Sequence, residues 1–224
     1  MTGMFITATG TEIGKTVVTA ALAHQSRAAG GAGWRAVKPV ISGYDPADRQ
    51  SDTAVLLRAM GRDVTPEAGA EISPWRFAAP LSPDMAATRE SRAIDPPALV
   101  DWCRARIAEG PTLVEGVGGA FVPLARGWLV ADWIAALDIP CLLVTGSYLG
   151  SLSHTLSCVE ALAARGLRPT AVIVSESVES PVPPAESIAT LRGWLDMPIR
   201  LLPRQRSVDP WRQTPPLADL LGKD

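Results

Sequence analysis

The chain opens with an apolar run, a short polar turn that contains glycine, and a segment with helical periodicity. The apolar run covers residues 4–8, and the helical segment covers residues 15–29 and ends in a glycine-rich stretch at residues 30–33. A strand that turns directly into a helix aims the free N–H groups and the positive dipole end of that helix at the turn. The opening therefore indicates an α/β fold with an anion-binding turn after its first strand.

The rest of the sequence repeats this alternation, which is typical of a mainly parallel sheet with helices on both faces. Further strands are predicted at residues 35–40, 112–115, 141–145, 171–175 and 199–202. Helices are predicted at residues 52–60, 98–108, 130–137, 152–164 and 185–195, with a short helical segment at 217–221. We expect a single domain over residues 1–224, because 47% of the residues are hydrophobic and no linker or repeat divides the chain.

One region departs from the alternation. Residues 44–97 contain one predicted helix, followed by a proline-rich stretch at residues 74–83. A connection of this length inside a compact domain usually serves a function. We therefore expect this segment to contribute residues to a functional site.

Charge and cysteine content exclude several classes of function. The 21 Lys and Arg residues are balanced by 23 Asp and Glu residues, so there is no basic excess to hold a nucleic acid. Cys103, Cys141 and Cys158 have no metal-ligand spacing, which indicates buried thiols in a reducing compartment. The first residues lack the features of a signal peptide, and aspartates interrupt the most apolar later stretch. We expect a cytoplasmic protein with no nucleic-acid or membrane partner.

Residues 9–16 read Thr-Gly-Thr-Glu-Ile-Gly-Lys-Thr and predict a phosphate-binding loop. Lys15 would neutralise the outer phosphates of a nucleotide, and the Thr16 hydroxyl would hold Mg²⁺. A strict P-loop has glycine five residues before Gly14, where this chain has Thr9. The other interpretation is an ordinary strand-to-helix turn. The position after the first strand and the Gly-Lys-Thr sequence together favour phosphate binding.

Three charged residues could complete such a site. Glu115 ends a predicted strand, so its carboxylate would point into the crevice at the carboxyl ends of parallel strands and could hold Mg²⁺. Asp52 could do the same, or could be only a helix N-terminal residue favoured by the dipole. Lys38 could join Lys15 in gathering a phosphate and a carboxylate-like group. The alternatives are a solvent-facing Glu115 and a structural Lys38 before a proline turn.

Taken in order, several motifs resemble those of the dethiobiotin synthetases. They are residues 9–16, 38–43 (Lys-Pro-Val-Ile-Ser-Gly), 51–52 (Ser-Asp), 80–83 (Pro-Leu-Ser-Pro), 114–119 (Val-Glu-Gly-Val-Gly-Gly) and 149–154 (Leu-Gly-Ser-Leu-Ser-His). The resemblance implies a P-loop NTPase-like fold and an ATP- and Mg²⁺-dependent ligase. Such a ligase closes the ureido ring of dethiobiotin from 7,8-diaminononanoate and CO₂ through a phosphorylated carbamate, and releases ADP and phosphate in biotin biosynthesis.

The resemblance also implies roles for individual residues. The metal ligands would be Thr16, Asp52 and Glu115, and the carbamate and the transferred phosphoryl group would be held by Thr11, Lys15, Lys38 and Ser42. The nucleotide would be bound by Glu12, Ile13, Gly14, Lys15, Thr16, Val17, Glu115, Gly118 and Ser175. Glu12 would be either catalytic support or a surface charge. The substrate would also contact Gly118, Gly119, Leu149, Gly150 and Ser153, in part across the interface of a homodimer.

Two departures from the family pattern concern the nucleotide base and the start of the loop. Ser175 stands where the family often carries an asparagine that reads the base, so nucleotide preference is left open. Ala8 stands where the loop usually begins with glycine, which requires a negative φ at that residue.

Two other functions remain as alternatives. A cobyrinate-type ATP-dependent amide ligase normally carries an additional glutaminase domain, for which 224 residues leave no room. An ATPase switch of the partitioning or cell-division type usually has an extra lysine near the start of the phosphate loop, and residues 6–9 contain none.

Overall fold

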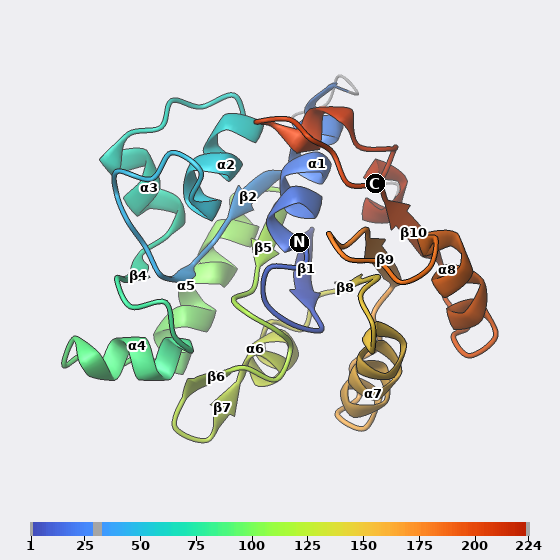
Figure 1. Ribbon diagram of the computed structural model, residues 1–224. Helices are drawn as coiled ribbons and strands as arrows, with labels where there is room; N and C mark the ends of the chain where they lie inside the picture. The colour runs from blue at the N-terminus through green and yellow to red at the C-terminus, as the bar shows by residue number, and fades with distance from the viewer. Residues whose placement is uncertain (1, 29–32, 223–224) are drawn as a thin grey trace.

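The computed structural model describes residues 2–28 and 33–222. Its central sheet has six parallel strands in the order β10-β9-β8-β1-β5-β2 (Figure 1). These strands are β1 (Gly3–Ala8), β2 (Arg35–Val37), β5 (Thr112–Glu115), β8 (Cys141–Gly146), β9 (Ala171–Ser175) and β10 (Ile199–Leu202). The predicted mainly parallel sheet is therefore confirmed.

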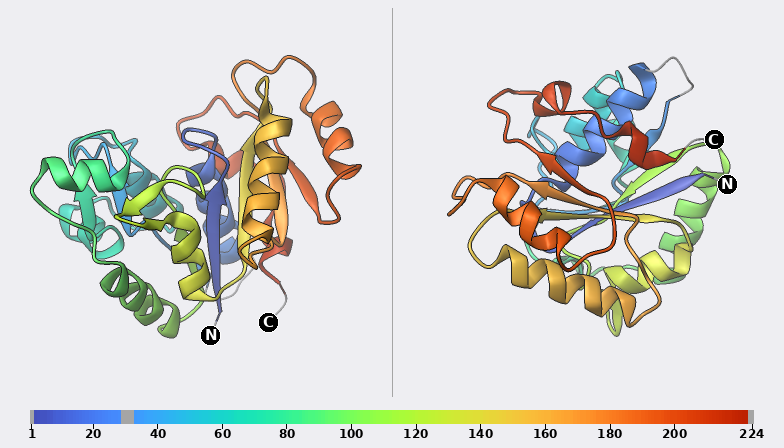
Figure 2. Two further views of the ribbon diagram at one scale, coloured as in Figure 1. Left: turned by 90° about the horizontal axis from the view of Figure 1, so that it is seen from below. Right: turned by 90° about the vertical axis from the view of Figure 1, so that its right-hand side faces the viewer.

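Helices cover both faces of this sheet, as predicted (Figure 2, right). One face carries α1 (Lys15–Ala28) and α2 (Asp52–Ala59), which pack against each other. The other face carries α5 (Pro96–Ala108), α6 (Val130–Leu137) and α7 (Ser151–Ala163), with α8 (Pro184–Arg192) beside α7. All six residues of β1 are buried, as expected for a strand covered on both faces.

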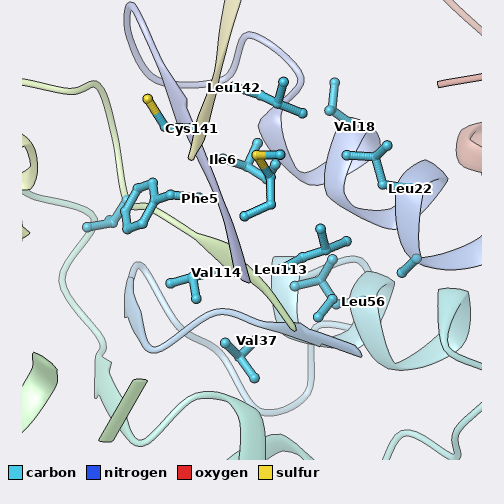
Figure 3. Close-up of a cluster of buried hydrophobic side chains, with 14 of the residues drawn as sticks. Phe5, Ile6, Val18, Leu22, Val37, Leu56, Leu113, Val114, Cys141 and Leu142 are labelled. Atoms are coloured by element: carbon cyan, nitrogen blue, oxygen red, sulfur yellow. The ribbon is translucent and has the colours of Figure 1, made fainter. Parts of the chain in front are cut away.

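Alternate side chains of the central strands fill two apolar layers (Figure 3). Ile6 and Leu142 lie on the side of α1, where Leu22 is fully buried. Phe5 points to the opposite face and meets the Trp133 ring of α6 edge to face, with ring centroids 4.9 Å apart. Such aromatic contacts add to the free energy gained by removing the rings from water.

The strand order creates a switch point at β1. The chain runs from β1 through α1 to the β2 edge, and it later fills the other half of the sheet with β8, β9 and β10. The loops that follow β1, β5 and β8 therefore leave the same edge of the sheet in different directions. Ligands bind at such points in open parallel sheets.

The prediction of one continuous strand over residues 35–40 is wrong, because the structure divides this range between two strands. The break follows β2, and β3 (Val40–Ser42) pairs in parallel with β4 (Trp75–Phe77) in a separate two-stranded sheet. Pro39 lies at the break and has no N–H to donate, so it cannot continue the ladder with β5. The break leaves Lys38 at the carboxyl end of β2.

The prediction of one helix within residues 44–97 is also wrong. Besides α2, this region forms α3 (Pro66–Ile72), α4 (Pro83–Arg89) and the strand β4. Each of the two additional helices begins with proline, which is favoured in the first helical turn because its missing N–H has no partner there. Pro66 and Pro83 therefore each mark the start of a helix that was not predicted.

Smaller differences occur elsewhere in the chain. An unpredicted antiparallel hairpin joins β6 (Pro123–Ala125) and β7 (Trp128–Leu129). The segment predicted as helical at residues 217–221 is a 3₁₀ turn, η2 (Ala218–Leu221), preceded by a second one, η1 (Pro210–Gln213). Residues 29–32, where α1 was predicted to end, lie outside the described residues. Within residues 2–28 and 33–222, no helix is both long and apolar enough to cross a membrane.

The segment that contains η1 and η2 covers the outer side of α1. Trp211 is 1% exposed, and its ring lies 4.9 Å from the His24 ring. The Gln25 side chain donates to Pro215 O at 2.9 Å and accepts from Leu217 N at 2.8 Å. The helix that begins at the phosphate loop is thus covered by residues nearly 190 positions later in the chain.

We expect Trp211→Ala to lower the free energy of unfolding by about 3–5 kcal/mol, because it leaves a cavity beneath the segment that covers α1. Trp194 is 73% exposed, so Trp194→Ala should change the same quantity by less than about 0.5 kcal/mol. Urea unfolding of the two variants measures the difference. Equal destabilisation by both would contradict this view of the C-terminal segment.

Candidate active site

The loop between β1 and α1 has a backbone that few side chains permit. Glu12 adopts φ of 58° and Gly14 adopts φ of 97°, both in the left-handed region. A Cβ at Gly14 would lie 2.6 Å from Ser175 Oγ, so only glycine fits there. Ala8 is the last residue of β1 and is not among the residues with positive φ, as its methyl group requires.

Lys15, the first residue of α1, is buried beneath this loop. It is 6% exposed, and its Nζ donates to Gly10 O at 3.3 Å. Burial, and next the nearby charge of Lys38, lower the pKa of Lys15 from 10.5 to about 8. Protonated Lys15 is therefore a cation held without enough negative charge around it.

A second lysine lies at the centre of a buried charge cluster. Lys38 Nζ is 2.7 Å from Glu115 Oε1, 2.9 Å from Asp52 Oδ2 and 2.9 Å from Gly116 O. The Thr16 hydroxyl is 2.8 Å from both Asp52 Oδ1 and Glu115 Oε1. Side chains from the ends of β2 and β5 and from the first turns of α1 and α2 thus meet at one point.

The charges in this cluster stabilise one another. Burial alone would lower the pKa of Lys38, but Asp52 and Glu115 outweigh it, so the pKa of Lys38 is raised. For Asp52, burial acts toward a higher pKa, and the ion pair with Lys38 outweighs it, so the pKa of Asp52 is lowered. Ser51 is the N-cap of α2, so Asp52 occupies the first helical turn and pairs with Lys38 at the same time.

The cluster has the oxygen atoms to accept a hard cation. Thr16 has one hydroxyl proton but two carboxylate oxygens within 2.8 Å, and Glu115 Oε2 is buried without any hydrogen-bond partner. Residues 2–28 and 33–222 contain no group of three or more His, Cys, Asp or Glu residues suited to a metal. Mg²⁺ fits this pattern, because it commonly binds one or two carboxylates together with waters and substrate phosphates.

A cavity of about 750 Å³ opens above the two lysines. The predicted site residues that line it are Thr11, Glu12, Gly14, Lys15, Thr16, Val17, Lys38, Ser42, Asp52 and Gly118. Glu115 lies beneath them and is fully buried, which excludes a solvent-facing role. The two cations and the exposed hydroxyl of Thr11 make this cavity suitable for an anionic ligand.

A second cavity, of about 510 Å³, lies on the other side of the phosphate loop. Its walls include the predicted nucleotide contacts Ile13 and Ser175. Glu12, Gly14 and Val17 line both cavities, so the two meet at this loop. A ligand with phosphates in one cavity and a ring system in the other would cross the loop.

Four of the predicted substrate residues line neither cavity. Gly119 is buried against the phosphate loop, where an added Cβ would lie 3.2 Å from both Ala8 O and Gly10 N. Leu149, Gly150 and Ser153 lie at the start of α7, with Leu149 86% exposed. Within one chain, this segment faces outward.

Several lining residues were not predicted from the sequence. Asp48 and Gln50 reach the first cavity from the loop before α2, and Tyr148 and Glu176 line the second. A polar loop just ahead of Asp52 was the available signal for the first pair. No local pattern marks the others, because they meet only through the pairing of β8, β9 and β10.

Comparison with known proteins shows the family. A family model described as an AAA domain matches residues 2–208. The ATP-dependent dethiobiotin synthetase BioD of Acidiphilium cryptum is 55% identical over 187 residues, covering 82% of this chain and 83% of that protein. The protein of the same description from Methylobacterium nodulans is 48% identical over 204 residues, covering 86% and 90%.

Solved structures show the same fold at low sequence identity. The MinC:MinD cell division protein complex of Aquifex aeolicus matches with a TM-score of 0.57 at 14% identity, covering 95% of this chain and 86% of the matched one. A ParA family ATPase from Chlorobium tepidum gives 0.53 at 13% identity, covering 92% and 85%. These two share the P-loop NTPase fold, whereas the sequence relatives show that the chain belongs to the ATP-dependent dethiobiotin synthetase family.

Proposed function

We propose that this chain uses ATP to convert 7,8-diaminononanoate and CO₂ to dethiobiotin. One amine adds to CO₂ and loses a proton, which gives a carbamate. The carbamate oxygen takes the γ-phosphoryl group of ATP, and ADP leaves. The second amine attacks the carbamoyl carbon, the ring closes, and phosphate leaves. The observation that supports this most directly is the cavity above Lys15 and Lys38, in a chain 55% identical to a dethiobiotin synthetase.

The residues around this cavity suit phosphoryl transfer, which depends on positioning and charge neutralisation. Lys15 and Lys38 would neutralise the carbamate and the transferred phosphoryl group. Thr11 and Ser42 line the same cavity and would donate hydroxyl hydrogen bonds to the carbamate oxygens. In this role the four side chains stabilise charge that develops during the transfer.

Thr16, Asp52 and Glu115 would hold Mg²⁺. The ion would supply charge neutralisation to the phosphates. The unpartnered Glu115 Oε2 and the two carboxylate oxygens that share the single Thr16 hydroxyl proton support this assignment. Asp52 and Glu115 would also keep Lys38 protonated while it faces the substrate.

The nucleotide would cross the phosphate loop. The loop residues Glu12, Ile13 and Gly14, with Val17 of α1, line the second cavity, and Ser175 is at its wall. We therefore place the base in the second cavity and the phosphates over Lys15, with Gly118 on the far side of the first cavity. Glu12 lies at the boundary between base and phosphates, where it could act as support or as a surface charge.

We further propose a homodimer in which the segment that begins α7 serves the partner's substrate. The outward position of Leu149, Gly150 and Ser153 supports this, because it separates them from the cavity of their own chain. Gly118 and Gly119 would contribute beside them. We also propose a cytoplasmic location, which the three buried free thiols Cys103, Cys141 and Cys158 support.

An ATPase switch is the main alternative, since MinD and ParA proteins share the fold. Incubation with ATP, Mg²⁺, bicarbonate and the diamino acid distinguishes the two functions. We expect ADP release to require the diamino acid and to match the dethiobiotin formed. Release that is independent of the diamino acid would favour the switch. A panel of nucleoside triphosphates in the same assay tests the role of Ser175.

Lys15→Ala should lower the turnover of this reaction by at least about 100-fold, because a buried charge that neutralises the phosphoryl group is lost. Arg168→Ala is the matched control. Arg168 is exposed in the connection before β9. It lies at the amino-terminal ends of the strands, away from the site at their carboxyl ends, so its loss should leave turnover unchanged. Turnover close to that of the unchanged chain in Lys15→Ala would remove Lys15 from the site.

Thr16→Val should raise the Mg²⁺ concentration needed for half-maximal ATP binding by about tenfold or more, because one oxygen ligand is replaced by a methyl group. Thr112→Val is the control, since Thr112 is buried at the other end of β5. Calorimetric titration of ATP at several Mg²⁺ concentrations gives the comparison. Equal Mg²⁺ dependence in both variants would argue against Thr16 as a ligand.

The pKa of Lys15 predicts how the stability of the protein without nucleotide and Mg²⁺ depends on pH. Between pH 8 and 10.5 the unfolded chain keeps a proton on Lys15 that the folded chain has lost, so the free energy of unfolding rises with pH. Relative to Lys15→Met, it should rise by about 1.5 kcal/mol from pH 8 to 9.5. The pKa of Lys38 is raised, so Lys38 adds nothing in this window. If the free energy of unfolding of the unchanged protein, relative to that of Lys15→Met, fell with rising pH, the result would contradict the burial of a protonated Lys15.

A further inference from the structure

A line of buried hydroxyl groups runs from the phosphate loop to α7. Thr9 Oγ1 lies 3.2 Å from Thr145 Oγ1, which lies 2.7 Å from Thr155 Oγ1. Thr155 Oγ1 in turn donates to Ser151 O at 2.6 Å. Thr145 and Thr155 are fully buried. This line joins the first residue of the phosphate loop, the strand β8 and the first turn of α7.

The direction of these hydrogen bonds follows from the number of protons. Each hydroxyl has one proton, and that of Thr155 goes to Ser151 O, so Thr155 must accept from Thr145. Thr145 has then used its own proton and must accept from Thr9. All three donors point toward α7, so each bond polarises the next. The Thr9 hydroxyl and the Ser151 carbonyl are thus the two ends of one directed row of hydrogen bonds.

A second connection joins the same segment to the other cavity. Ser147 N donates to Ser177 Oγ at 3.0 Å, and Ser177 N donates to Ser147 Oγ at 2.9 Å. Ser147 is 1% exposed, and Ser177 lines the second cavity. This reciprocal pair fixes the loop after β8 to the loop after β9. Tyr148, the next residue in the chain, also lines that cavity, and its O accepts from Ser151 N at 3.0 Å.

The backbone that ends β8 is tightly packed at Gly146. A Cβ at Gly146 would lie 2.5 Å from the Tyr148 ring and 2.8 Å from Ser177 Oγ. Gly150, the N-cap of α7, has φ of 97°. The start of the stretch from Thr145 to Ser151 is therefore fixed, whereas Leu149 is 86% exposed and a Cβ at Gly150 would meet only His154 Cε1, at 3.8 Å, so the turn before α7 has room to move.

We propose that Thr145 and Ser147 are positioning residues that couple occupation of the nucleotide site to the first turn of α7. Phosphates on the loop would hold Thr9, and a base in the second cavity would hold Ser177 and Tyr148. Both ends of the stretch would then be fixed, and the turn that carries Leu149, Gly150 and Ser153 would be ordered. This inference rests on the proposed function, in which that turn contacts the diamino acid of the partner subunit.

Hydrogen exchange followed by mass spectrometry tests the coupling on the full chain. We expect a non-hydrolysable ATP analogue with Mg²⁺ to slow exchange of the amides at residues 149–156 by at least about fivefold in the unchanged protein. In Thr145→Val, which keeps the shape and removes the hydroxyl, the slowing should fall below about twofold. Thr145→Ser should restore it. Thr112→Val, another buried threonine in a strand, should behave as the unchanged protein does.

Calorimetry on the same samples separates this inference from the proposed function. Failure of the unchanged protein to bind the analogue would overturn both. Binding without slower exchange in α7 would overturn the coupling alone. The coupling would also be overturned if Thr145→Val showed as much slowing as the unchanged protein, or if Thr112→Val lost as much slowing as Thr145→Val. If Thr145→Val does not fold, Ser147→Ala replaces it in the same test, because it removes the hydrogen bond that Ser177 N donates to Ser147 Oγ in the second connection. Supporting data would also show that the analogue lowers the dissociation constant of the diamino acid in the unchanged protein more than in Thr145→Val.

Discussion

The ion pair between Lys38 and Glu115 is the interaction on which the site and much of the sheet edge depend. Both side chains are removed from water, which costs several kcal/mol for each charge unless close partners compensate. The register of β2 and β5 places Val37 beside Val114, so the next residue on each strand meets its partner across the ladder. Asp52 and Thr16 complete the cluster from two helices. Strand pairing, helix starts and charge balance are therefore satisfied together.

Of the two lysines in the cluster, Lys15 has no carboxylate close to its ammonium group among the residues that the structure describes. Lys15, Lys38, Asp52 and Glu115 sum to zero, but the carboxylates lie closest to Lys38. Lys15 is buried with only a long contact to Gly10 O. Buried charges without partners are costly, and an anionic ligand removes that cost by its presence. The uncompensated charge of Lys15 thus lowers the stability of the fold, and in the proposed function the phosphates of ATP would restore that stability on binding.

Sequence reasoning predicted those parts that follow from local pattern. Parallel strands end at one edge of the sheet, so the positions of Lys38 and Glu115 at strand ends are enough to predict that both lie near the phosphate loop. Local pattern did not predict the break at Pro39 or the helices that begin at Pro66 and Pro83, because proline suits both turns and first helical turns. The hydroxyl line through Thr145 was beyond reach for a different reason. Its residues meet only because β1 lies beside β8, and strand order is a property of the whole chain.

The cover that the C-terminal segment forms over α1 has a consequence for folding during synthesis. The chain leaves the ribosome from its N-terminus, so α1 emerges early, whereas Trp211 and Leu217 emerge nearly two hundred residues later. Until then, the outer side of α1 lacks its native neighbours. Contacts between residues so distant in sequence form slowly, because a long loop must close first. The helix that bears Lys15 is therefore among the first elements made and among the last to be completed.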